Sequence, residues 1–101
     1  MIDVIASIRI KDGHTDEFIE KFKANVAAVL AEEGCIDYYP TIDSDAGMAV
    51  QEMDTQVVTI VEKWESLEAL QAHSKAPHMA RFRESAKSIV EGMTLKVLRK
   101  A

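Results

Sequence analysis

The residues best suited to chemistry lie in one stretch that links a strand to a helix. Trp64 ends a run rich in β-branched residues, Glu62 precedes it by two positions, and His73 follows nine residues later. Alternation puts Glu62 and Trp64 on one strand face, and helical spacing puts His73 on the apolar side of the next helix. A half-buried imidazole can accept a proton near neutral pH, and an indole can stack on a flat ring. We therefore predict that His73 is a general base and that Trp64 is a wall of a binding pocket.

Each of these three residues also has a purely structural explanation. His73 could be a core histidine that is hydrogen-bonded to backbone, and Trp64 could serve core packing alone. Glu62 could pair with an arginine of the helices instead of orienting His73 or a substrate hydroxyl. The sequence leaves both kinds of explanation open.

The expected substrate-binding residues are Tyr38, Glu62, Leu70, His78 and Phe82. Tyr38 and its neighbour Tyr39 must face opposite sides of a strand, and the sequence does not fix which one lines the pocket. His78 follows a proline at the start of a helix, where a role at the rim of the site competes with simple exposure. No third ligand accompanies His73 and His78, so we expect no metal site.

Hydrophobic periodicity predicts the elements that position these residues. Strands are expected over residues 2–10, 35–42, 57–64 and 93–99, and Pro40 restricts the second of these to a sheet edge or a bulge. The resulting order, β-α-β-β-α-α-β, predicts an α+β, ferredoxin-like domain over residues 1–101, with a four-stranded antiparallel sheet and helices on one face.

Capping residues and glycines predict the helix limits. Thr15 is expected to cap a first helix that Gly34 ends, and Ser66 to cap the helix that carries His73. A last helix is expected to begin at Pro77 and to stop at Gly92. Residues 43–56 are turn-rich, and their second half could be a strand extension or a lid over the site.

The apolar content of the strands indicates a partner for the sheet. Ile5, Val58 and Ile60 cannot all be covered by helices together with the other apolar strand residues. A second copy of the same sheet is the simplest cover, so we expect a homodimer.

Charge and cysteine content restrict the partners and the compartment. The formal net charge is −5 and no run of basic residues occurs, which argues against nucleic acid and anionic membranes. No segment approaches the roughly 18 consecutive apolar residues of a membrane span. The one cysteine, Cys35, favours a reducing cytoplasm. A hydrophobic, aromatic small molecule remains the best candidate ligand.

Four segments carry a resemblance to a known family: residues 33–38 (EGCIDY), residues 62–70 (EKWESLEAL), His73 and residues 76–78 (APH). With this element order the chain resembles the quinol monooxygenase branch of the antibiotic biosynthesis monooxygenase family, whose members are dimeric α/β barrels. The resemblance implies a homodimer whose sheets meet, with a pocket between sheet and helices in each subunit. It also implies oxidation of a quinol or polycyclic phenol by O2 without flavin, haem or metal.

Two other functions remain open within that resemblance. An isomerase of a small oxygenated metabolite would use the same base to move a proton. A non-catalytic dimer would bind a small ligand without turnover.

Overall fold

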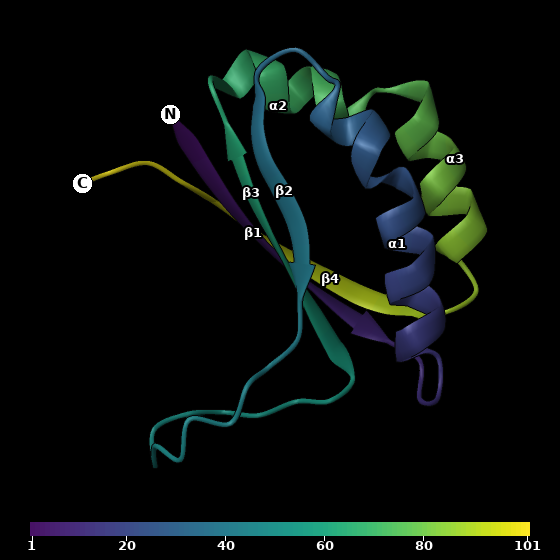
Figure 1. Ribbon diagram of the computed structural model, residues 1–101, viewed down its shortest axis with the longest axis vertical. Coiled ribbons are helices and arrows are strands. Elements are labelled where there is room, and N and C mark those ends of the chain that lie inside the picture. Colours follow the sequence, from purple (N-terminus) through teal and green to yellow (C-terminus); the bar gives the residue numbers. More distant parts are fainter.

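The computed structural model describes residues 1–101, and its strands form one antiparallel sheet. The elements in chain order are β1 (Ile2–Ile10), α1 (Thr15–Leu30), β2 (Cys35–Thr41), β3 (Val57–Trp64), α2 (Leu67–Ser74), α3 (Pro77–Ala86) and β4 (Val90–Leu98). The strand order is β2-β3-β1-β4, with every pairing antiparallel. Helices α1 and α3 lie side by side over one face, and α2 lies across its end (Figure 1). The predicted α+β, ferredoxin-like arrangement and the edge position of β2 are confirmed.

Strand register decides which side chains reach the helices. Val4 of β1 lies opposite Glu62 of β3, and Ile2 lies opposite Trp64. These positions face the helices, and every second residue of β3 is buried there from Val58 to Trp64. A bulge between Cys35 and Asp37 shifts the register of β2 on β3. These pairings place Glu62 and Trp64 beneath α2, as alternation predicts.

The prediction for the bare face of the sheet is wrong in part. Val58 and Ile60 are fully covered by the helices, because they share the face of Glu62 and Trp64. Ile5, Val61 and Tyr39 lie on the opposite face, where β1, β3 and β2 bring them side by side. An apolar stripe therefore remains on the uncovered face. Of its three expected members only Ile5 lies there, because Val58 and Ile60 point to the other side of β3.

α1 and α3 end earlier than the sequence suggests. No helix is long and apolar enough to cross a bilayer. Thr15 is the first residue of α1 and does not cap it, because His14 occupies the N-cap position. Gly34 does not end α1 directly but shapes the turn into β2 with φ +83°. Gly92 does not stop α3: that helix ends at Ala86, and Gly92 pairs with Arg9 inside β4. β4 begins at Val90 because β1 offers it a pairing partner there.

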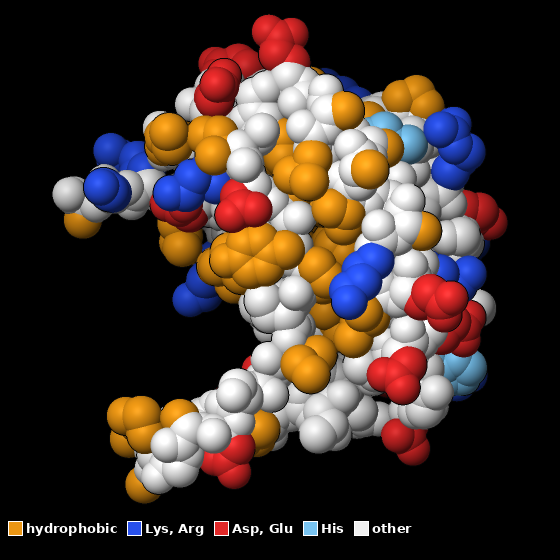
Figure 2. Space-filling view, in the orientation of Figure 1, with side chains coloured by type: hydrophobic (Ala, Val, Ile, Leu, Met, Phe, Trp, Pro, Cys, Tyr) orange, Lys and Arg blue, Asp and Glu red, His pale blue; other side chains and the backbone are white.

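The loop between β2 and β3, residues 42–56, projects away from the sheet (Figure 1). Its base is tied to β1 by an ion pair between Arg9 and Asp54 at 2.6 Å. Its tip exposes Met48 and Val50, and Figure 2 shows this apolar tip separate from the body. The loop contributes no residue to the cavity described below. It is neither a strand extension nor a lid over the site of its own chain.

Candidate active site

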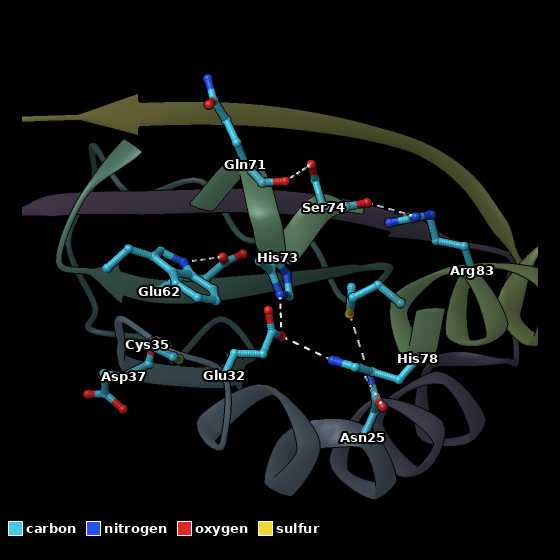
Figure 3. Close-up of polar contacts among 12 residues, drawn as sticks. Asn25, Glu32, Cys35, Asp37, Glu62, Gln71, His73, Ser74, His78 and Arg83 are labelled. Atoms are coloured by element: carbon cyan, nitrogen blue, oxygen red, sulfur yellow. Dashed lines mark hydrogen bonds and ion pairs between the residues drawn. The ribbon is translucent and has the colours of Figure 1, made fainter. Parts of the chain in front are cut away.

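His73 is fixed between α2 and the end of α1. The hydroxyl of Ser66 accepts a hydrogen bond from the backbone N–H of Ala69 at 3.1 Å and so begins α2, as predicted. The His73 side chain then points inward and is only 6% exposed. Its Nδ1 lies 2.8 Å from Oε2 of Glu32, which belongs to the turn after α1 (Figure 3). A carboxylate at Nδ1 favours the tautomer that leaves Nε2 as a proton acceptor.

Glu62 and Trp64 form a second polar pair beneath the same histidine. The indole N–H of Trp64 donates to Oε1 of Glu62 at 3.0 Å, and both side chains are buried. Burial raises the pKa of the Glu62 carboxyl above its ordinary value, although the bond from Trp64 and the proximity of His73 oppose this shift. The Trp64 ring lies 4.7 Å from the His73 ring. Glu62 is therefore a buried acid whose hydrogen-bond partner, Trp64, lies against the His73 ring.

An apolar cavity of about 180 Å³ opens beside His73. Its lining combines the helix-facing side of the sheet with α1, α2 and α3, and it consists of Val4, Ala6, Ile8, Phe22, Tyr38, Ile60, Glu62, Leu70, His73, Ser74, Met79, Phe82, Arg83, Met93 and Leu95. Met93 and Leu95 come from β4 and remain about half exposed, so the cavity is open along that strand. Figure 2 shows apolar side chains gathered in the hollow between the sheet and the helices. A flat, largely apolar molecule suits such a lining.

Tyr38 supplies a neutral hydroxyl to this environment. Its ring stacks on Phe22 with centroids 5.0 Å apart and meets the His73 ring edge-on at 5.4 Å. Burial, reinforced by the carboxylates of Glu62 and Glu32, raises the pKa of the Tyr38 hydroxyl far above its ordinary value. The tyrosine therefore stays protonated at neutral pH. The same causes raise the pKa of the Cys35 thiol to about 11, so that thiol is not an activated nucleophile.

The structure brings five of the seven predicted site residues to the cavity wall: Tyr38, Glu62, Leu70, His73 and Phe82. Trp64 contacts the His73 ring but lies behind it and does not reach the cavity. His78 lies on the far side of Glu32, with Nε2 3.1 Å from Oε2 of that glutamate. Trp64 and His78 therefore contact residues beside the cavity and do not line it.

Two polar residues of this environment were not assigned a role from the sequence. Glu32 contacts both His73 and His78, and Arg83 is the only arginine or lysine in the cavity wall. A signal for Glu32 existed, because an acid just past a helix C-terminus meets the negative end of the helix dipole and needs a partner. Arg83 carried no such signal. No group of three or more His, Cys, Asp or Glu side chains is arranged to hold a metal ion.

Comparison with known protein families identifies the family to which this fold and site belong. The family model described as antibiotic biosynthesis monooxygenase matches residues 1–85, and the chain belongs to that family.

The chain is also similar to a named relative and to solved structures. The chain is 38% identical over 100 residues to the Escherichia coli (strain K12) protein named "Probable quinol monooxygenase YgiN", covering 97% of this chain and 96% of the relative. A Bacteroides thetaiotaomicron protein described as a possible oxidoreductase is 29% identical, with a TM-score of 0.78 and coverage of 96% and 94% of the two chains. A conserved Methanosarcina mazei protein is 23% identical, with a TM-score of 0.84 over 99% and 92%, and shows the same fold.

Proposed function

We propose that the protein is a monooxygenase that oxidises a quinol or related phenol with O2 and needs no cofactor of its own. One observation carries the proposal: an imidazole with Nδ1 held by a carboxylate forms part of the wall of an apolar cavity. Membership of a monooxygenase family and similarity to a protein named as a quinol monooxygenase support it.

The cavity favours a small aromatic substrate. An apolar cavity of roughly 150 Å³ accommodates benzene, and the cavity here measures about 180 Å³ and opens along β4. A single aromatic ring fits inside, and a second fused ring would extend toward the opening at Met93 and Leu95. Larger polycyclic phenols would have to extend out through this opening.

The proposed reaction begins with removal of a phenolic proton by Nε2 of His73. The resulting anion is a good one-electron donor, and transfer of one electron to O2 gives a substrate radical and superoxide. Their recombination forms a carbon–oxygen bond, and the peroxide takes the proton back from His73 to become a hydroperoxide. Loss of the ring C–H proton and cleavage of the O–O bond then give a quinone and water. One oxygen atom of O2 enters the product, the other leaves in water, and the substrate supplies the electrons.

The surrounding side chains provide position and charge for these steps. Arg83 brings a positive charge to the cavity rim, where it favours the substrate anion over the neutral phenol. The neutral Tyr38 hydroxyl can donate a hydrogen bond to substrate oxygen. Apolar walls exclude bulk water, so the radical pair recombines before it separates.

Oxygen consumption by the metal-free protein tests the proposal. The substrate is a reduced naphthoquinone, the rate is corrected for autoxidation, and His73→Ala is measured beside the wild type. The matched control is His14→Ala, because His14 lies at the start of α1, outside the cavity lining, and its side chain is hydrogen-bonded to Glu17. We expect a rate above background that falls by about 10²- to 10⁴-fold in His73→Ala and is unchanged in His14→Ala.

The other outcomes each reject a defined part of the proposal. A rate that survives His73→Ala would retain the reaction class and discard His73 as base. Substrate turnover without O2 uptake would favour an isomerase, and binding without turnover would favour a non-catalytic ligand-binding protein.

We further propose that a second copy covers the bare face of the sheet. Ile5, Val61 and Tyr39 form an apolar stripe there, and Tyr39 remains 42% exposed. Light scattering coupled to size exclusion should report a homodimer for the wild type. Tyr39→Glu would place a charge in the stripe and should shift the population toward the monomer. A monomeric wild type would reject this arrangement.

A further inference from the structure

One carboxylate oxygen joins two histidines from different helices. Oε2 of Glu32 lies 2.8 Å from Nδ1 of His73 on α2 and 3.1 Å from Nε2 of His78 on α3 (Figure 3). Glu32 itself belongs to the turn that follows α1. The three side chains are mostly buried, so these contacts are shielded from water. A buried carboxylate without partners costs free energy, so the contacts with the two histidines matter for the stability of this arrangement.

The two contacts differ in quality. The His73 contact meets hydrogen-bond geometry, whereas Nε2 of His78 is buried and has no aligned hydrogen-bond partner despite its proximity to Glu32. The other ring nitrogen of His78, Nδ1, lies 3.3 Å from Oδ1 of Asn25. His78 is therefore tethered to α1 and faces Glu32, while the aligned hydrogen bond of the carboxylate goes to His73.

We propose that Glu32 is the positioning residue for His73 and that His78 restrains Glu32 from the opposite side. This inference rests on the proposed function and adds two residues to it. The carboxylate accepts from Nδ1–H of His73, which leaves the Nε2 lone pair as the only proton acceptor of the ring. When His73 takes the substrate proton, the new positive charge lies next to Glu32 and is stabilised by it.

The accessibility of Nε2 agrees with this assignment. His73 lines the cavity, and no protein group is hydrogen-bonded to its Nε2. Only one side-chain nitrogen or oxygen, Nε2 of His78, is both fully buried and without a hydrogen-bond partner. Nε2 of His73 does not share this condition. The free nitrogen of the base is thus open to a ligand, and the bonded nitrogen is turned toward Glu32.

The tautomer of His73 gives a test that does not depend on activity. Long-range proton–nitrogen correlation spectra of nitrogen-15-labelled protein at mildly alkaline pH distinguish Nδ1–H from Nε2–H rings. Signals of the three histidines are assigned by single substitutions at His14, His73 and His78. We expect His73 in the Nδ1–H form in the wild type and a shift toward the Nε2–H form in Glu32→Leu. The matched control is Glu33→Leu, because Glu33 is the adjacent, exposed glutamate.

Turnover of the reduced naphthoquinone gives the second measurement. We expect Glu32→Leu to lower kcat by about 10- to 100-fold, with KM changed much less. Glu32→Gln keeps an acceptor for Nδ1–H but removes the charge, so we expect it to retain the tautomer and still lower kcat by about tenfold. This variant also keeps the test decisive if Glu32→Leu does not fold. His78→Asn should lower kcat by severalfold and give a mixed tautomer at His73.

The outcomes separate this inference from the proposed function. An unchanged His73 tautomer in Glu32→Leu, or full kcat in Glu32→Gln, would overturn the positioning role of Glu32. A tautomer that depends on Glu32 in a protein that oxidises no quinol would keep the positioning role and reject the proposed reaction. A tautomer and kcat unaffected by His78→Asn would remove His78 from the arrangement.

Discussion

The ring of Trp64 lies 4.7 Å from the ring of His73, yet only His73 reaches the cavity. The indole N–H of Trp64 donates to Glu62, and its ring lies against the His73 ring. Trp64, which the sequence suggests as a pocket wall, therefore lies against His73 and outside the cavity lining.

Stability should depend on pH through Glu62. Its pKa is raised in the folded state, chiefly by burial, so the folded protein binds this proton more tightly than the unfolded chain does. The contribution is fully present below the unfolded pKa of about 4.5 and is lost as pH rises through the folded pKa. We expect Glu62→Gln to increase the free energy of unfolding relative to wild type at neutral pH, with no gain at acid pH. Denaturant unfolding over a pH series measures this, with the exposed Glu20→Gln as control.

Trp64→Phe should destabilise the protein through Glu62 as well as through lost packing. The substitution leaves the buried Oε1 of Glu62 without its donor, which costs about 1–3 kcal/mol. Replacing both partners, in Trp64→Phe with Glu62→Leu, should recover part of the loss because no polar atom is then stranded. A double-mutant cycle of unfolding free energies measures the coupling. Strictly additive effects would show that the hydrogen bond contributes nothing.

Gly34→Ala should be more damaging than substitution of another glycine with a similar backbone. A Cβ at Gly34 would lie 2.6 Å from Cβ of Ala69, at a position with φ +83°. Gly13 has φ +80° and nothing within 4 Å, so Gly13→Ala reports the backbone strain alone. We expect Gly34→Ala to exceed this control by about 1–3 kcal/mol of unfolding free energy, the cost of overpacking. If Gly34→Ala and Gly13→Ala lowered the stability against thermal unfolding equally, the turn at Gly34 could move away from Ala69 without cost.

Arg83→Gln should weaken turnover without abolishing it. Arg83 lies at the cavity rim and is solvent-exposed, where a charge interaction contributes up to about 1 kcal/mol. We therefore expect kcat/KM for the quinol to fall by up to roughly fivefold, with less effect at high salt. Arg81→Gln is the control, since Arg81 is exposed on the same helix and does not line this cavity. An equal loss in both variants would assign the effect to general surface charge.

The helices and strands were predictable because the sequence signals that specify them involve residues close together in the chain. Alternation, a cap at Ser66 and a proline at the start of α3 each act within a few residues, and all three were confirmed. Gly92 was misread because glycine ends helices and also occurs in strands, and pairing with β1 decided between them. The local signals therefore predicted which helices and strands occur better than they predicted the residues at which these elements begin and end.

The site was less predictable because its key contact is not local. Glu32 and His73 are 41 positions apart, and only the packing of the α1 turn on α2 brings them together. The choice between Tyr38 and Tyr39 depended on how β2 is registered on β3. Residue types and spacing indicated a base near a strand end, but not the carboxylate that holds it.

The loop at residues 42–56 leaves the sheet at the end of β3 that is opposite to Trp64 (Figure 1). The eight residues of β3 separate the two ends by roughly 25 Å, at about 3.3 Å per residue. Insertions, deletions or grafted peptides in this loop are therefore separated by a whole strand from His73 and Glu32 of the same chain. The length and composition of this projection can therefore change without disturbing the contact between Glu32 and His73 in the same chain.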